Sequence, residues 1–153
     1  MKGPREDDPR TLPGRSFGAA VRAALRWLMA FFYGVAGWAH LDRPEGFLAI
    51  TPDWVPQPEL VVALTGVAEI AGALGLLWQP VRRWAGIGLA LYALCVWPAN
   101  FNHAFNDISI SGTNLDWSYH GPRLVAQPLI IWFALWVGEV TDWPFRATKA
   151  RLP

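Results

Sequence analysis

The sequence predicts an all-α protein, an integral membrane bundle of four helices with both termini on the cytoplasmic side. Hydrophobic residues make up 53% of the chain and charged residues only 16%, which is little charge for a soluble domain. Ten tryptophans, a side chain that prefers the boundary between lipid and water, occur in 153 residues. Apolar stretches close to the roughly 20 residues that cross a hydrocarbon core lie at about 17–41, 58–78, 81–103 and 121–140.

We expect one membrane domain over residues 16–141. Residues 1–15 combine charged side chains with Pro and Gly, a composition that predicts a disordered basic segment. Residues 142–153 are predicted to form a cytoplasmic tail. A cleaved signal peptide fits poorly, because the first apolar run is long and lacks a small-residue cleavage site. We therefore interpret this run as a retained first span.

The first predicted span carries two arginines, Arg22 and Arg26, in its first half. Their long side chains can reach the lipid headgroups by snorkelling if this half lies at the cytoplasmic end. The alternative is an amphipathic helix that lies in the interface.

Prolines mark the limits and the irregular points of the other spans. Pro58 stands at a suitable first helical position, and Gln79-Pro80 separates the second span from the third. Pro98 is expected to kink the third span and to free a backbone carbonyl near Leu94. The fourth span opens at Gly121-Pro122, and His120 is expected in the loop before it.

The loops indicate the orientation of the chain. Regions rich in Lys and Arg, namely the first segment, the loop with Arg82 and Arg83, and the tail, lie on one side of the predicted spans. The opposite loops carry mainly acidic residues: Asp42, Glu45, Asp53, Glu59, Asp107 and Asp116. The positive-inside rule places the first group in the cytoplasm, and an even number of spans agrees with this. In the first outer loop, Pro44 is expected to start a short helix that Thr51-Pro52 ends.

Glu69 is the polar residue that most needs an explanation. It lies about 11 residues into the second span, roughly 16 Å deep at 1.5 Å per residue. A carboxyl group there should be protonated, paired or facing a hydrated cavity. Its helical neighbours Thr65, Gly66, Gly72 and Ala73 form a small-residue face suited to close helix packing. We therefore expect Glu69 to point into the bundle.

Several other polar residues gather in the outer half of the predicted spans. Together with Glu69, the candidate pocket residues are Tyr33, His40, Thr65, Asn100, His103, Arg123 and Gln127. If they face inward, they form a polar pocket open to the outer side, with Arg123 and Glu69 as its opposite charges.

Two interpretations of these residues stand side by side. In the structural one, Arg123, Gln127 and Asn100 bond to loop backbone and to the carbonyls freed by Pro98. In the functional one, they bind a small polar or redox-active ligand. A sharper version makes His40 and His103 a metal or haem pair, but a third ligand of known spacing is missing, so the pattern does not favour haem or a metal.

Other classes of function have little support. The net charge is +1 and the chain has no basic stripe, which argues against nucleic-acid binding. Cys95 is the single cysteine, so an intramolecular disulfide and CxxC chemistry are excluded; we expect it as a buried small side chain on a helix. Hydrolase and nucleotide-binding motifs are absent from the sequence.

The motifs together resemble the DoxX family of small membrane proteins. The similarity covers roughly Phe32 to Trp136. The matching motifs are Gly37…His40…Arg43-Pro44, Pro52-x-Trp54-x-Pro56, Gly66-Val67-Ala68-Glu69, Pro98-Ala99-Asn100 and Arg123…Gln127. The family tends to have Arg-x-Pro-Leu-Gln in the fourth span, where this chain has Arg123-Leu-Val-Ala-Gln127. The resemblance implies a four-helix bundle of the cell membrane, and some members are subunits of a thiosulfate:quinone oxidoreductase or associate with oxidative-stress enzymes.

Our first hypothesis is therefore a multi-pass subunit of the plasma or inner membrane that takes part in redox or quinone chemistry. His40, His103 or Asn100 would donate to the quinone oxygens, and Glu69 would exchange protons. The chain has no visible electron carrier, so it would need a redox protein partner or a bound cofactor to be an enzyme. A non-catalytic scaffold that recruits a partner protein is the second hypothesis. A small transporter or proton pathway with Glu69 as the titrating group is the third. The small residues Gly34, Gly37, Gly86 and Ala90 are compatible with a homodimer and equally with packing inside one bundle.

Overall fold

The computed structural model describes residues 13–110 and 112–144. Its elements are α1 (Pro13–Asp42), α2 (Glu45–Ile50), α3 (Pro58–Leu77), the 3₁₀ turn η1 (Gln79–Val81), α4 (Arg82–Phe105) and α5 (Trp117–Val137). Within the described ranges there is no β-strand, only an isolated bridge between Ile110 and Thr113. The all-α prediction is therefore confirmed for this part of the chain. Residues 13–15 of the predicted disordered segment 1–15 belong to α1, so the prediction was wrong for them; residues 1–12 and the tail beyond residue 144 lie outside the described residues.

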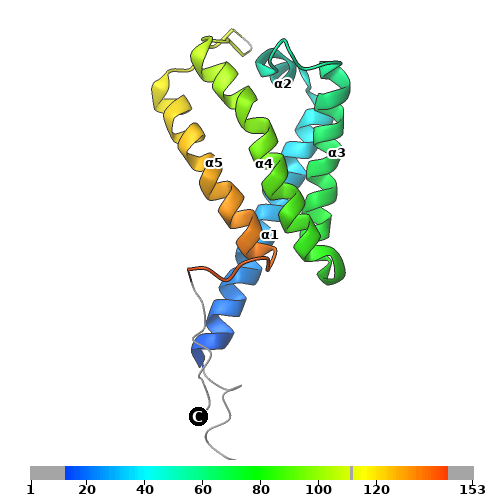
Figure 1. Cartoon of the computed structure of the whole chain (residues 1–153), viewed down its shortest axis with the longest axis vertical. Helices are drawn as coiled ribbons and strands as arrows, with labels where there is room; N and C mark the ends of the chain where they lie inside the picture. The colour runs from blue at the N-terminus through cyan, green and yellow to red at the C-terminus, as the bar shows by residue number, and fades with distance from the viewer. Residues whose placement is uncertain (1–12, 111, 145–153) are drawn as a thin grey trace, which may run out of the picture.

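The long helices run alternately up and down (Figure 1). We name the end with the start of α1 and the end of α5 the terminal end, and the opposite end the α2 end. Helix α1 packs along α3, and α4 packs along α5. Helices α1 and α5 have few contacts, and Figure 1 shows them meeting near the terminal end and diverging toward the α2 end. The bundle is thus two helical hairpins joined mainly at one end.

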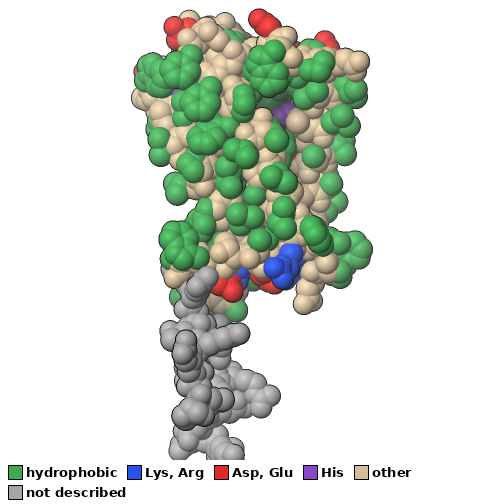
Figure 2. All heavy atoms as spheres, viewed as in Figure 1, with side chains coloured by type: hydrophobic (Ala, Val, Ile, Leu, Met, Phe, Trp, Pro, Cys, Tyr) green, Lys and Arg blue, Asp and Glu red, His purple; other side chains and the backbone are tan. Residues whose placement is uncertain are grey.

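Three helices are long and apolar enough to cross a membrane: Phe17–Asp42, Pro58–Leu77 and Gln79–Phe105. Large apolar side chains are exposed on every long helix, for example Trp38, Leu64, Leu91 and Val125. The face in Figure 2 is mainly hydrophobic between its ends, and the charged side chains gather at the ends. This distribution is that of a membrane protein, because burial in lipid rather than in a soluble core covers such side chains.

Glycines set the close crossing of α1 and α3. A Cβ atom on Gly37 would lie 2.5 Å from the carbonyl oxygen of Gly66, and one on Gly66 would lie 2.7 Å from the Cβ of His40. Only glycine allows the two backbones to approach so closely. This crossing brings the face of α1 that carries His40 against the face of α3 that carries Glu69.

The apolar core lies toward the terminal end. It contains Met29 of α1, Leu76 of α3, Leu89 of α4, and Ala134 and Val137 of α5. A second close approach supports it, since a Cβ atom on Gly86 would lie 2.9 Å from the Ala134 carbonyl oxygen. Gly37 and Gly86, named above for a homodimer, thus pack inside the bundle.

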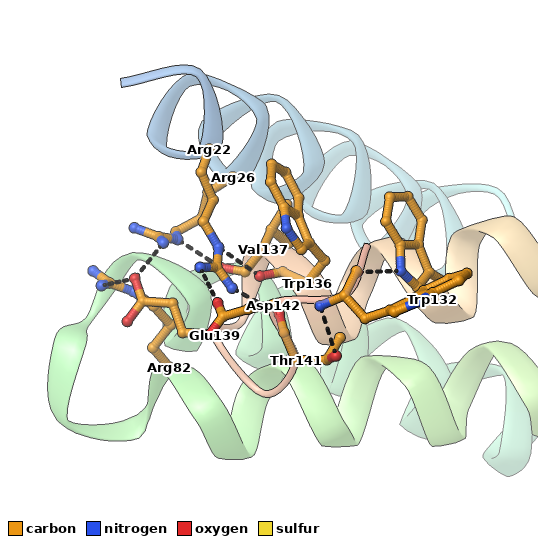
Figure 3. A network of polar contacts seen from close by, with 10 residues as sticks. Arg22, Arg26, Arg82, Trp132, Trp136, Val137, Glu139, Thr141 and Asp142 are labelled. Atoms are coloured by element: carbon orange, nitrogen blue, oxygen red, sulfur yellow. Dashed lines mark hydrogen bonds and ion pairs between the residues drawn. The ribbon is translucent and has the colours of Figure 1, made fainter. Parts of the chain in front are cut away.

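An arginine cluster joins α1, α4 and the end of α5 at the terminal end (Figure 3). Arg22 donates from Nε to the Trp136 carbonyl at 2.8 Å and pairs with Asp142 at 2.8 Å. Arg26 donates from Nε to the Val137 carbonyl at 2.8 Å. The last carbonyls of a helix have no partner inside it, so these bonds cap α5. The sequence led us to expect that these two arginines extend to the lipid headgroups. In the structure both guanidinium groups bind other parts of the protein.

Arg82 completes this cluster from α4. Its NH1 lies 3.0 Å from Oε1 of Glu139, the same oxygen that pairs with Arg26. Its Nε donates to the carbonyl of Leu76 at 3.0 Å. We use the name arginine cluster for Arg22, Arg26 and Arg82 with Glu139 and Asp142.

The boundaries of the fourth predicted span need correction. Helix α5 begins at Trp117 because Asp116 caps it, accepting a bond from the backbone N–H of Ser118 at 2.9 Å. His120 is consequently a buried helical residue and not a loop residue. The helix ends at Val137, before Glu139 with its φ of +61°. The short helix expected after Pro44 is confirmed as α2.

Candidate functional site

A cavity of about 730 Å³ lies between the two hairpins, toward the α2 end. It exists because the hairpins are packed together at the terminal end and diverge from there. Residues of α1, α2, α3, α4 and α5 all line it. Every residue predicted for the pocket lines it except His103; these are Tyr33, His40, Thr65, Glu69, Asn100, Arg123 and Gln127.

Helix α2 and the segment after it cover the α2 end of the cavity. Phe47, Ile50, Pro52 and Trp54 line it from this side. The side-chain amide of Asn102 donates to the Ile50 carbonyl at 3.1 Å and so ties α2 to α4. The cover is therefore fixed to both hairpins, since α2 follows α1 directly.

His40 and Glu69 form a buried pair in the wall of the cavity. Nδ1 of His40 lies 3.1 Å from Oε2 of Glu69 and also 2.9 Å from the Ala36 carbonyl. Both side chains are less than one tenth exposed. Oε2 of Glu69 approaches Nδ1 of His40 closely, but without a hydrogen bond of good geometry. The Phe47 ring stacks on the His40 ring at 3.6 Å between centroids.

Two tyrosines accompany this pair. Tyr33 of α1 and Tyr92 of α4 meet edge to face, 6.1 Å between ring centroids, and both interact electrostatically with Glu69. The predicted set contained Tyr33 but missed Tyr92, which also lines the cavity. A single aromatic residue in the middle of an apolar span gives no signal of its own. The pair and the tyrosines together can bind a polar group and hold a proton beside it.

Two amides occupy the wall between α4 and α5. The Gln127 side chain donates to the Ala93 carbonyl, and Asn100 donates to Oε1 of Gln127 at 3.4 Å. Pro98 lies next to these groups in the sequence of α4 and has no N–H to donate. The bond goes to the carbonyl of Ala93, whereas Pro98 removes the N–H that would pair with the carbonyl of Leu94, so the predicted bond to a freed carbonyl is not the one observed.

Arg123 lines the cavity but does not pair with Glu69. Its NH1 lies 3.0 Å from Nδ1 of His103, and its guanidinium lies 5.7 Å from the centre of the Tyr119 ring. Among the described residues it has no carboxylate partner. Arg123 therefore brings positive charge to the cavity wall, while the carboxylate on the opposite hairpin is held by His40.

His103 lies outside the cavity, fully buried behind Arg123. Its ring meets that of His120 edge to face at 4.6 Å. His103 Nε2 is buried without a hydrogen bond of good geometry. His40 and His103 thus have different neighbours, and the described part of the chain contains no group of three His, Cys, Asp or Glu side chains placed to hold a metal.

Cys95 is exposed and lines the cavity, so the expectation of a buried side chain was wrong. It lies one turn before Pro98, on the side of α4 that the diverging hairpins leave uncovered. As the single cysteine, it offers a unique position for labelling beside the cavity.

The fold and the site together define a class: a helical membrane protein with a cavity between two hairpins and a buried His–Glu pair in its wall. The model of one family, described as a domain of unknown function (DUF8561), matches residues 29–138. The chain belongs to this family. The match includes almost all of the cavity wall. The comparisons with curated proteins and with solved structures found no match. The resemblance to the DoxX family stays a prediction.

Proposed function

We propose that the protein is a four-span protein of the cell membrane, with both termini in the cytoplasm, and that its cavity binds a quinone in membrane redox chemistry. Helix α5 supplies the fourth span. Its 21 residues measure about 31 Å at 1.5 Å per residue, enough for a hydrocarbon core. Its polar residues Arg123 and Gln127 line the cavity, while Val125 and Leu129 are exposed. The inward polar residues lower its mean hydropathy without exposing polar groups to lipid.

The distribution of charge supports the orientation. Arg82 and Arg83 are the first residues of α4, at the terminal end, and the acidic residues Asp42, Glu45 and Asp53 lie at the α2 end. The positive-inside rule then places the terminal end in the cytoplasm.

The buried His40–Glu69 pair inside a 730 Å³ cavity is the observation that carries the proposal. Ligand sites are usually apolar cavities with a few convergent polar groups, and this volume is in their range. Hydrogen-bond donors stand on both hairpins: the hydroxyl of Tyr33 on one, and the guanidinium of Arg123 on the other. A para-quinone has an acceptor oxygen at each edge of its ring, which fits donors on two walls.

The chemistry of the pair suits this ligand. Reduction of a quinone to a quinol adds two electrons and two protons, and a buried imidazole and carboxyl group can pass protons to the quinone oxygens. The electrons come from a protein partner in this proposal. The chain would then be a membrane subunit that binds the quinone, which agrees with what the DoxX resemblance implies.

The test is to purify the protein in mild detergent and to analyse the extracted small molecules by mass spectrometry, together with the absorption spectrum. We expect a stoichiometric quinone from the wild type and a loss of at least half of it from Tyr92→Phe. Tyr119→Phe is the matched control, because it removes a hydroxyl outside the cavity wall. A colourless protein that carries only bulk lipid would contradict the proposal.

The proton pathway is a second candidate, because Oε2 of Glu69 is buried without a hydrogen bond of good geometry. The scaffold hypothesis is supported by the bond of Gln127 to the Ala93 carbonyl, because this bond joins α5 to α4 without a ligand. Glu69→Gln separates the candidates. A scaffold would keep its fold and its partner, a proton pathway would lose proton-linked transport in vesicles, and a quinone site would lose bound quinone.

A further inference from the structure

We infer that the ligand of the cavity is a quinone with an apolar chain, and that it enters sideways from the bilayer with its chain lying in a slot between α1 and α5. This inference rests on the proposed function and deepens it. The slot is defined by Leu28 and Met29 of α1 and by Ile130 and Phe133 of α5, all of which line the cavity.

The cavity is elongated, with polar groups at one end and apolar groups at the other. Along α1, Leu28 lies about 18 Å from His40 at 1.5 Å per residue. Along α5, Phe133 lies about 15 Å from Arg123. Most of the polar lining residues lie toward the α2 end, Glu69 and Tyr92 lie near the middle of their helices, and the slot residues are all apolar. A ligand that matches this wall has a compact polar ring and an apolar chain.

The end of the cavity that faces the loops is covered. Phe47 stacks on His40, and Asn102 ties α2 to α4 through the Ile50 carbonyl. Direct entry from water at this end would have to displace α2. A ring that reaches His40 and Glu69 must therefore come from another direction.

The sides of the cavity are open where the hairpins diverge. Leu28 and Phe32 line the cavity and are nevertheless 48% and 61% exposed, so they stand at an opening beside α5. Cys95 marks an opening on α4 in the same way. These side chains lie between the charged ends of the bundle, at the depth of the hydrocarbon core in the proposed arrangement. A lipid-soluble molecule can enter there without crossing water.

The experiment compares two quinones with the same ring, one bearing a ten-carbon chain and one without a chain, by equilibrium binding to the purified full-length protein. We expect the chain-bearing quinone to bind at least tenfold more tightly, because the slot removes its chain from water or detergent. Ile130→Trp fills the slot and should reduce this affinity at least tenfold while leaving the chainless quinone unchanged. Val125→Trp, on the exposed face of α5, should change neither affinity.

The outcomes separate the two proposals. Equal affinity for both quinones, or an Ile130→Trp variant that binds both as the wild type does, would overturn the slot and leave the quinone site standing. Failure of both quinones to bind the wild type would overturn the proposed function and this inference with it. Leu28→Trp blocks the slot from the other wall, so it repeats the test if Ile130→Trp does not fold; its folding is checked by its affinity for the chainless quinone.

Discussion

At the terminal end of the bundle, Arg22, Arg26 and Arg82 all donate to carboxylates and to helix carbonyls. Between the middle of the bundle and the α2 end, polar atoms of similar burial have no hydrogen bond of good geometry. Among the described residues these atoms are Oε2 of Glu69, Nε1 of Trp97, Nε2 of His103 and Nδ1 of His120. The same fold thus satisfies its polar groups at one end and leaves several unsatisfied at the other.

This difference indicates that the polar groups of the arginine cluster stabilise the fold, whereas Glu69 serves function. A buried polar group without a partner costs about 1–3 kcal/mol. Such a cost is typical of functional sites, and among these four atoms only Oε2 of Glu69 belongs to a residue that lines the cavity, where a ligand can supply the missing partner. We therefore expect substitutions in the arginine cluster to act mainly on stability and substitutions around Glu69 to act mainly on ligand binding.

The largest effect is expected from Arg26→Ala. The substitution leaves the buried Val137 carbonyl without its side-chain donor and leaves Arg82 as the remaining partner of Glu139, so it should lower the free energy of unfolding by about 2 kcal/mol. Unfolding in detergent, followed by circular dichroism, measures this. Arg43→Ala is the control, because that side chain is 85% exposed. Equal losses for the two variants would show that the arginine cluster does not hold the terminal end together.

The same substitution at both ends tests the comparison directly. Glu139→Gln removes the charge that Arg26 and Arg82 share and should cost about 1 kcal/mol, since Glu139 is partly exposed. Glu69→Gln should leave stability unchanged or raise it, because a neutral amide is cheaper to bury than a carboxylate. The test is to measure the free energies of unfolding of the two variants in the same assay and to compare their losses relative to the wild type. A greater loss for Glu69→Gln would reverse our assignment of the two ends.

A smaller loss is expected from Gln127→Leu, which sharpens the comparison inside the cavity. The Ala93 carbonyl loses its side-chain donor, and the free energy of unfolding should fall by about 1 kcal/mol. Gln79→Leu, at an exposed glutamine, should have little effect in the same unfolding assay. An unchanged stability of Gln127→Leu would move Gln127 from a helix-locking role to a ligand-binding one.

The smallest effect concerns Asp116 at the start of α5. The hydroxyl and the backbone N–H of Ser118 donate to its carboxylate and hold the pKa of Asp116 below its ordinary value. Because the folded pKa is lowered, the cap stabilises α5 fully above the ordinary pKa of about 3.9 and is lost as the pH falls through the lower value. An NMR titration of the carboxyl carbon should show the pKa rising toward the ordinary value in Ser118→Ala. An unchanged pKa would mean that Ser118 does not hold the cap.

Much of the fold could be predicted from local patterns. Proline and threonine at the ends of α2 gave its limits, and the apolar stretches gave the long helices because few charges interrupt them. The inward direction of Glu69 followed from its small neighbours, of which Gly66 makes the closest contact with α1. Helix depth and helix face are properties of one segment, so one sequence reveals them.

Pairing between segments could not be predicted in the same way. The sequence suggested Arg123 as the charge opposite Glu69, but the rotation of α1 at the Gly37–Gly66 crossing gives that place to His40. His103 has the depth of a cavity residue and nevertheless faces His120 instead of the cavity. Such outcomes depend on the rotation of each helix about its axis, which composition does not determine.

The bonds of Arg26 also have a consequence for biosynthesis. Its backbone partner Val137 is synthesised 111 residues later, after the other long helices. Until α5 is in place, the first helix carries arginines whose partners do not yet exist. A chain halted before residue 137 would therefore expose unpaired positive charge at the start of its first helix, a feature by which quality control in the membrane could distinguish incomplete chains from finished ones.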